Sequence, residues 1–154
     1  MSIDEKKLVT MIQSLFQSQS LGVLATRDKE YPYCTLVGFV GTYDLKRIIF
    51  ATLRDTRKYT NIKTYQKISI LIDSRSNRVD DFKDAMALTV LGNAREAEGE
   101  ELEKLSALYL ARHPHLREFL QDPNCALMII EVERYIMVTR FQQVMEIDIK
   151  AIRE

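Results

Sequence analysis

Residues 2–18 carry apolar side chains at the spacing of a helix. Ser2 and Glu5 have the S-x-x-E spacing of a capping box, in which side chains bond the exposed amides at a helix start. Apolar residues then recur every three or four positions and form one stripe: Ile3, Leu8, Met11, Ile12, Leu15 and Phe16. The polar run 17–20 follows this stripe. The pattern predicts one amphipathic helix over residues 2–18.

After residue 20 the pattern changes to short apolar runs that are rich in β-branched and aromatic residues, as strands are. We predict strands over residues 21–26, 33–42, 47–53, 67–73, 86–97, 126–138 and 141–149. Gly92 lies inside one of these runs and indicates a bulge or a close approach of two backbones. One short helix is expected within residues 54–65, and a polar loop over residues 74–83.

Residues 100–112 predict a second clear helix. Its first turn is acidic, Arg112 lies in its last turn, and Pro114 follows it, as helix-dipole and backbone rules favour. We expect its buried face to consist of Leu102, Leu105, Leu108 and Tyr109. Residues 116–120 suit one further helical turn before the last two strands.

The order of these elements favours an α+β, mainly β fold. Several consecutive strands with interposed helices suit an antiparallel sheet better than a doubly wound parallel one. Closure of such a sheet removes its exposed edges, so we predict a split β-barrel with peripheral helices. The 154 residues contain no repeat and no linker, which indicates a single domain over residues 1–154.

Charge and cysteine content restrict the possible partners and the compartment. The chain has 22 basic and 22 acidic residues, a balance that argues against nucleic acid or an anionic membrane as a partner. Cys34 and Cys125 form no CxxC pair, and we expect both to be buried small hydrophobes in a reducing compartment. The first residues lack the apolar stretch of a signal peptide, and no apolar run is long enough to span a bilayer. We therefore expect a soluble, cytoplasmic protein.

The most informative segment is 48–62, where an apolar strand leads into a basic loop and a short helix. The loop contains hydroxyl and cationic side chains close together: Thr52, Arg54, Thr56, Arg57 and Lys58. A phosphate monoester binds to such donors, best at a helix N-terminus. Residues 54–67 contain five basic residues and one acidic residue. The same charges also suit a solvated helix face or a contact with a nucleic-acid backbone.

In its strand context this segment resembles a known family. The pattern Ala51-Thr-x-x-x-Thr-Arg-Lys-x-x-Asn-Ile62 is similar to the flavin-phosphate segment of the pyridoxamine 5'-phosphate oxidase-like, FMN-binding split-barrel family. Residues 32–37, 71–73 and 88–94 resemble further strands of that family, in the same order. The resemblance extends from residue 15 to residue 149. It implies a Greek-key split barrel that binds flavin mononucleotide (FMN).

The resemblance assigns roles in phosphate binding to five residues. Arg57 and Lys58 would pair with the flavin phosphate. Thr52, at the end of the preceding strand, would donate to phosphate or ribityl oxygens, with Ala51 beside it. Asn61 matches a helix position that braces the loop.

The resemblance also assigns residues to the flavin ring. Thr35, Leu36 and Val37 would line the edge of the isoalloxazine through their backbone groups. Thr89 matches a position that contacts the flavin from a neighbouring strand, in many members across a dimer interface. The resemblance therefore implies a homodimer.

The chain departs from the true oxidases, so vitamin B6 oxidation is not expected. It lacks their C-terminal Arg-x-His segment and contains no tryptophan. We expect an FMN-dependent oxidoreductase or flavin reductase that acts on an unidentified small molecule or electron donor. The alternatives are a flavin carrier without turnover, a deazaflavin-dependent reductase, and a haem-binding protein that uses His113 or His115. We expect no metal site, because the two histidines lack nearby residues at ligand spacing.

Overall fold

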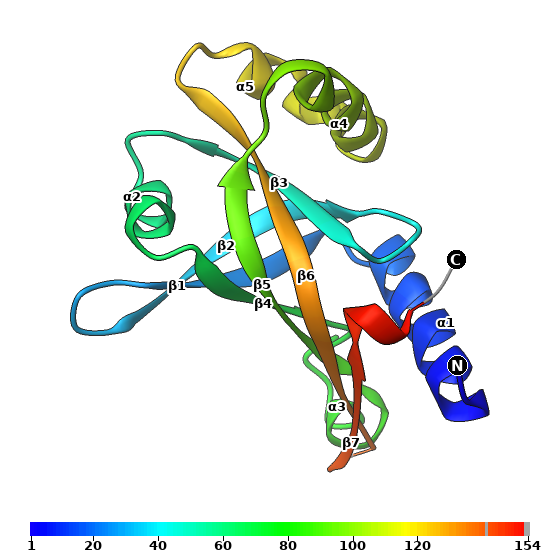
Figure 1. Cartoon of the computed structure of the whole chain (residues 1–154). Coiled ribbons are helices and arrows are strands. Elements are labelled where there is room, and N and C mark those ends of the chain that lie inside the picture. The colour runs from blue at the N-terminus through cyan, green and yellow to red at the C-terminus, as the bar shows by residue number, and fades with distance from the viewer. Residues whose placement is uncertain (141, 153–154) are drawn as a thin grey trace.

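The computed structural model describes residues 1–140 and 142–152 (Figure 1). The strands are β1 (Leu21–Arg27), β2 (Pro32–Gly41), β3 (Arg47–Leu53), β4 (Lys67–Asp73), β5 (Ala87–Glu96), β6 (Cys125–Thr139) and β7 (Gln143–Asp148). The α-helices are α1 (Ile3–Ser18), α2 (Arg57–Thr64), α3 (Asp81–Asp84), α4 (Gly99–Arg112) and α5 (Arg117–Gln121). Two 3-10 turns are present, η1 (Pro114–Leu116) and η2 (Ile149–Ala151). The predicted elements are present, and α3 is one added turn within the predicted loop. The predicted start of the last strand, Phe141, lies outside the described residues.

The strands form one antiparallel sheet in the order β3-β2-β1-β4-β5-β6-β7. A further antiparallel pairing of β3 with β6, from Arg47 opposite Glu131 to Leu53 opposite Cys125, closes the first six strands into a barrel. Strand β4 returns beside β1 after the β1-β2-β3 meander, which is the Greek-key arrangement. The predicted fold class, an α+β split barrel, is confirmed.

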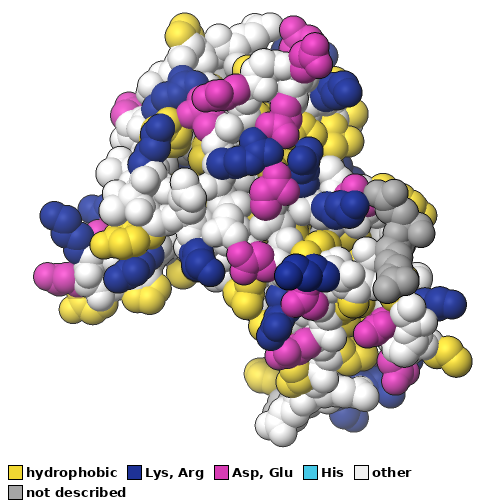
Figure 2. All heavy atoms as spheres, viewed as in Figure 1, with side chains coloured by type: hydrophobic (Ala, Val, Ile, Leu, Met, Phe, Trp, Pro, Cys, Tyr) yellow, Lys and Arg dark blue, Asp and Glu magenta, His cyan; other side chains and the backbone are white. Residues whose placement is uncertain are grey.

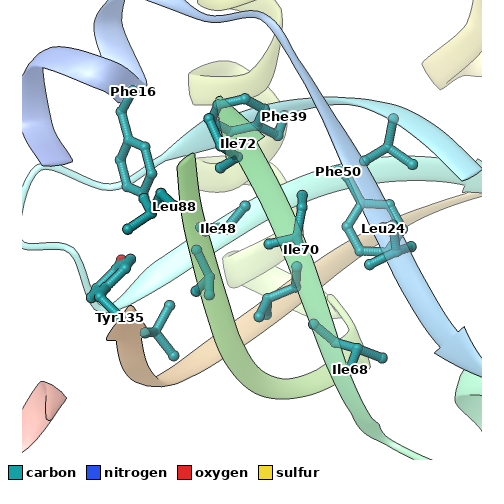
Figure 3. Close-up of a cluster of buried hydrophobic side chains, with 14 of the residues drawn as sticks. Phe16, Leu24, Phe39, Ile48, Phe50, Ile68, Ile70, Ile72, Leu88 and Tyr135 are labelled. Carbon is teal, nitrogen blue, oxygen red and sulfur yellow. The ribbon is translucent and has the colours of Figure 1, made fainter. Parts of the chain in front are cut away.

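The barrel interior is filled by inward side chains of the strands and is closed at one end by α1. The α1 helix begins with the predicted capping box and buries Leu8, Ile12, Leu15 and Phe16. The Phe16 ring packs edge-on against Phe39, with ring centroids 5.8 Å apart, and close to Tyr135 (Figure 3). Burial of large aromatic side chains of this kind contributes most to the stability of a core.

Gly92 marks the one register shift between β5 and β6. Leu91 lies opposite Arg134, but Gly92 lies opposite Val132, so Glu133 is the extra residue of a β-bulge. A β-carbon at Gly92 would lie 2.4 Å from the backbone oxygen of Glu131. The predicted close approach of two backbones is therefore present, and only glycine fits.

The α4 helix covers the outer side of β3 and β6, where it forms a second apolar cluster with them. Leu105 and Tyr109 are buried in this cluster. The predicted buried face was too wide, because Leu102 and Leu108 are 39% and 37% exposed. The sheet surface under α4 contacts only the side of the helix centred on Leu105 and Tyr109.

The environment of the two cysteines corrects a second expectation. Cys34 is exposed and Cys125 is partly buried. Strand β2 alternates, with Val37 and Phe39 pointing inward, so Cys34 lies on the outer face.

Among the described residues, no helix is long and apolar enough to cross a membrane.

Candidate phosphate and flavin site

The loop between β3 and α2 is shaped by its own hydroxyl groups. Thr56 is the N-cap of α2, and its hydroxyl accepts a hydrogen bond from the Tyr59 amide at 3.4 Å. The same hydroxyl donates to the Leu53 carbonyl at 2.8 Å and lies 2.9 Å from the Thr52 hydroxyl. Thr52 is only 1% exposed, so its side chain supports the loop from inside. Its predicted direct bond to phosphate stays a prediction.

Lys58 lies in the first turn of α2 and is half-buried. Partial burial lowers the pKa of its ammonium, and within residues 1–140 and 142–152 no carboxylate forms an ion pair with it. A desolvated cation at a helix N-terminus is costly to maintain, since neither water nor an acid fully compensates its charge. An anion bound in front of α2 would supply the missing partner.

The cost of partly burying the Lys58 ammonium leads to a prediction for the ligand-free protein. We expect Lys58→Met to raise the unfolding midpoint by about 1–2 °C at pH 7, because the partly buried charge is removed. Burial places the pKa of Lys58 in the folded protein below its value in the unfolded chain. The wild type therefore gains stability as the pH rises through the folded pKa, and its unfolding midpoint should approach that of Lys58→Met toward pH 10. Thermal unfolding across pH measures both effects, with exposed Lys67→Met as the control. A lower midpoint for Lys58→Met would show that its charge already has a partner.

Arg57, the neighbouring cation, is exposed and only weakly engaged. Its Nε atom lies 3.9 Å from Oδ2 of Asp28, and its guanidinium lies 5.1 Å from the centre of the Tyr33 ring. These groups line a hollow of about 320 Å³ beside the β1–β2 hairpin. An exposed ion pair at this distance contributes little stability. Arg57 is therefore free to turn toward an anion at the start of α2.

Asn61 braces α2 against the barrel. It is 7% exposed, and its side-chain amide donates to the Thr26 hydroxyl on β1 at 3.0 Å. A buried hydrogen bond between two elements fixes their relative position, because breaking it leaves unpaired polar groups. The position of the first turn of α2 is thereby tied to the barrel.

Strands β2 and β3 form a fork beside this loop. They pair only from Phe39 opposite Phe50 to Gly41 opposite Ile48, while β3 continues along β6. Within the described part of the chain, the edge of β2 at Thr35–Val37 therefore has no strand partner on the β3 side. Leu36 is 66% exposed and Val37 is buried, and the buried hydroxyl of Thr35 has no hydrogen-bond partner among the described residues.

Tyr109 of α4 holds this fork at its closed end. Its hydroxyl donates to the Gly38 carbonyl on β2 at 3.0 Å and lies within hydrogen-bonding reach of the Ala51 backbone on β3. Burial raises the pKa of Tyr109 to about 12, so the hydroxyl keeps its proton at neutral pH. Ala51 thus lies where the strands separate, next to the predicted site.

Thr89 lies on the same outer face as Leu36 but away from the fork. The register places Leu36, Val23, Leu71 and Thr89 in one row across β2, β1, β4 and β5. Three strand spacings separate the ends of this row by about 14 Å. Within one chain, Thr89 and Leu36 therefore lie at opposite ends of a row that crosses four strands.

The two histidines differ in accessibility. His113 caps the C-terminus of α4 and is 2% exposed, and its Nε2 atom lies 2.7 Å from the Phe39 carbonyl. His115 is exposed on the following turn. No group of three or more potential metal ligands occurs among the described residues.

One residue that the sequence pattern did not indicate, Glu96, also belongs to this region. Glu96, at the end of β5, accepts hydrogen bonds from Arg54 and from the Tyr59 hydroxyl, each at 2.7 Å. Arg54, which the sequence grouped with the phosphate-binding cations, is thus engaged with a carboxylate. Glu96 lies 42 positions from Arg54 along the chain, and no local pattern connects them.

A comparison with protein families matches residues 8–138 to the pyridoxamine 5'-phosphate oxidase model. The chain belongs to this family. No curated protein sequence matches the chain. Membership of the pyridoxamine 5'-phosphate oxidase family agrees with the closed antiparallel barrel and with the order of its strands.

Solved structures similar to this member of the oxidase family carry different names. A haem-binding protein from Mycobacterium smegmatis is 19% identical with a TM-score of 0.82, over 93% of this chain and 58% of that one. The haem storage protein HutZ from Vibrio cholerae is 18% identical with a TM-score of 0.72, over 85% of this chain and 93% of that one. A putative pyridoxamine 5'-phosphate oxidase from Listeria innocua is 14% identical with a TM-score of 0.68, over 85% of this chain and 98% of that one. These likenesses support the fold alone.

Proposed function

We propose that the chain binds FMN, with the phosphate in front of α2. The observation that carries the proposal is Lys58, a half-buried ammonium without a carboxylate partner among the described residues. A phosphate monoester carries nearly two negative charges at neutral pH. Arg57 and the amides of the first turn of α2 supply the remaining donors. The residues present therefore fit the phosphate group.

The flavin ring would lie along the open edge of β2. Alternate residues of a strand direct their backbone groups to opposite edges, so part of the backbone of Thr35–Val37 faces this edge, which has no strand partner among the described residues. Bound FMN supplies hydride or electron transfer, which side chains alone do not perform. The part of the protein is to hold the ring and exclude water. An oxidoreductase or flavin reductase for a small molecule is the activity that this arrangement supports best.

We also propose that the site is completed in a homodimer. The outer face of β1, β2, β4 and β5 carries half-exposed apolar side chains: Leu21, Val23, Leu36, Leu71 and Leu91. Such a patch is typical of an interface between proteins. A twofold axis through this face would bring Thr89 of one protomer toward Leu36 of the other, whereas the two lie about 14 Å apart within a single chain.

The dimer proposal predicts a clear effect of Leu36→Glu. A carboxylate at this position would be buried without a partner, so we expect a monomer with at least tenfold weaker FMN binding. Light scattering and flavin titration measure the two properties. Leu102→Glu, at a partly exposed position on α4, should remain dimeric. A dimeric Leu36→Glu protein with normal FMN affinity would exclude this face as the interface.

Haem is a second candidate, because two similar structures are named for haem binding or storage. In this chain the His113 ring is buried and engaged with Phe39, which leaves His115 as the accessible ligand. Deazaflavin is a third candidate and would use the same phosphate loop. The fit of Lys58 and Arg57 to a phosphate monoester favours FMN over haem.

Extraction of the ligand from freshly purified protein tests the proposed function. We expect mass analysis to identify FMN, and we expect protein stripped of ligand to take up FMN with quenching of its fluorescence. A haem Soret band in the wild type that disappears in His115→Ala would identify haem, and not FMN, as the ligand. A mass that corresponds to a deazaflavin would identify a different cofactor that binds at the same phosphate loop. Failure to take up any flavin would contradict the proposal.

A further inference from the structure

The Glu96 carboxylate joins three parts of the fold beside the proposed phosphate site. Its Oε2 atom accepts a hydrogen bond from Arg54 on the β3–α2 loop, and its Oε1 atom accepts one from the Tyr59 hydroxyl on α2, each at 2.7 Å. Arg54 also donates to the Pro123 carbonyl at 2.9 Å, and its amide bonds the Asn124 carbonyl. The carboxylate thus connects β5, the phosphate loop and the approach to β6.

These contacts bracket the two cations that would hold the phosphate. Arg54 lies three positions before Arg57, and Tyr59 directly follows Lys58. Tyr59 is 8% exposed, so its ring and its hydroxyl anchor the inner side of α2, while Arg57 is exposed and Lys58 is half-buried. Fixing both flanks of a loop reduces the entropy that it loses when it binds a ligand.

The same contacts decide which cations are available. The Arg54 guanidinium holds the pKa of Glu96 below its ordinary value, so the carboxylate is ionised at neutral pH and neutralises Arg54. Arg57 and Lys58 then remain to meet the nearly doubly charged phosphate. Charge-assisted hydrogen bonds of this kind have well-defined geometry, so the Arg54 guanidinium is held against the Glu96 carboxylate.

We propose that Glu96 is a positioning residue for phosphate recognition, which makes the site selective for FMN over the unphosphorylated flavin. It acts through Arg54 and Tyr59 and does not itself touch the ligand. This inference rests on the proposed function, and it adds a residue on a distant strand that sets the strength and selectivity of the same site.

The test compares the binding of FMN and riboflavin to three proteins. Wild type is expected to prefer FMN. Glu96→Gln keeps the size of the side chain but removes the charge, so we expect its affinity for FMN to fall about tenfold while its affinity for riboflavin stays the same. Glu101→Gln is the matched control. The Glu101 side chain is exposed to a similar extent as that of Glu96, and it accepts a hydrogen bond from Arg95, which lies outside the phosphate loop. Its preference for FMN should equal that of the wild type.

The ratio of the two affinities separates positioning from stability. A general loss of structure would weaken both flavins, whereas a displaced phosphate loop weakens FMN alone. If Glu96→Gln keeps the wild-type ratio, or raises it because Arg54 is released to the phosphate, the inference is overturned. If it does not fold, Tyr59→Phe removes one of the two contacts and should lower the ratio about threefold, and an unchanged ratio would overturn the inference. A wild type without preference for FMN would instead contradict the proposed function itself.

Discussion

The double variant Arg57→Ala, Lys58→Ala should bind FMN with a free energy that is weaker by about 3–6 kcal/mol. Each hydrogen bond to a charged group contributes about 1.5–3 kcal/mol, and the variant removes two such groups. Both side chains are expected to point at the same phosphate, from the first turn of α2. Lys58 contributes a partly desolvated charge, and Arg57 gives up only a weak ion pair with Asp28 to reach the anion. Titration calorimetry or flavin fluorescence measures the change.

Riboflavin provides the control for this variant because it lacks the phosphate. Its affinity should be the same in wild type and in the double variant. The pair Lys63→Ala, Lys67→Ala removes two exposed charges from the same basic segment and should leave FMN affinity nearly unchanged. Equal losses for both double variants would indicate a diffuse electrostatic effect, as on a solvated helix face or a nucleic-acid patch. Unchanged FMN affinity in the first variant would place the phosphate elsewhere.

Gly92→Ala should destabilise the fold by about 3 kcal/mol or more. The added β-carbon would lie 2.4 Å from the Glu131 backbone oxygen and 2.9 Å from a methyl group of Ile130. Relief requires movement of the β6 backbone at the bulge, because neither atom belongs to a flexible chain end. Since β5 continues from the bulge to Glu96, FMN binding should weaken together with stability.

Gly99→Ala is the comparison for this prediction. Gly99 has a φ of +61°, and apart from its chain neighbours and its own helix backbone no described group lies within 4 Å of its β-carbon position. Its substitution should cost only about 1–2 kcal/mol of backbone strain. Chemical denaturation of the two variants measures both effects. Equal free energies of unfolding would show that the bulge adapts to a side chain.

Local patterns were sufficient to predict most of the fold. The strands 47–53 and 67–73 were predicted with the bounds that the structure has, because apolar runs there are flanked by charged turns. Ser2 and Glu5 marked the start of α1 through two reciprocal hydrogen bonds. Gly92 marked the bulge, since a glycine within a strand indicates close approach of another backbone.

Features that depend on tertiary contacts were not accessible from the sequence. Residues 33–40 form a nearly continuous apolar run, so alternation did not reveal that Cys34 faces outward. Helical spacing placed Leu102 and Leu108 on the apolar stripe, but the sheet beneath α4 covers only its centre. In the candidate site, the sequence indicated a cluster of cations but not their partners. The ion pair of Arg54 with Glu96 became visible only in the folded chain.

Several arginine side chains on the surface lie next to acidic side chains. Figure 2 shows basic and acidic side chains next to one another over the upper half of the molecule. Arg47, Arg95, Glu101 and Glu131 form one group of alternating charge, in which each arginine contacts both acids. Lys58 differs from these cations, because none of the described carboxylates forms an ion pair with it. A balanced net charge thus coexists with a partly buried lysine at the proposed phosphate site.

A crystal structure of the protein grown with FMN tests the central claim most directly. We expect the phosphate within hydrogen-bonding distance of the Lys58 ammonium and the first amides of α2, with Arg57 turned from Asp28 toward it. The flavin ring should follow the β2 edge at Thr35–Val37. A flavin bound elsewhere, with the ammonium of Lys58 still unpaired and Arg57 still beside Asp28, would contradict the account.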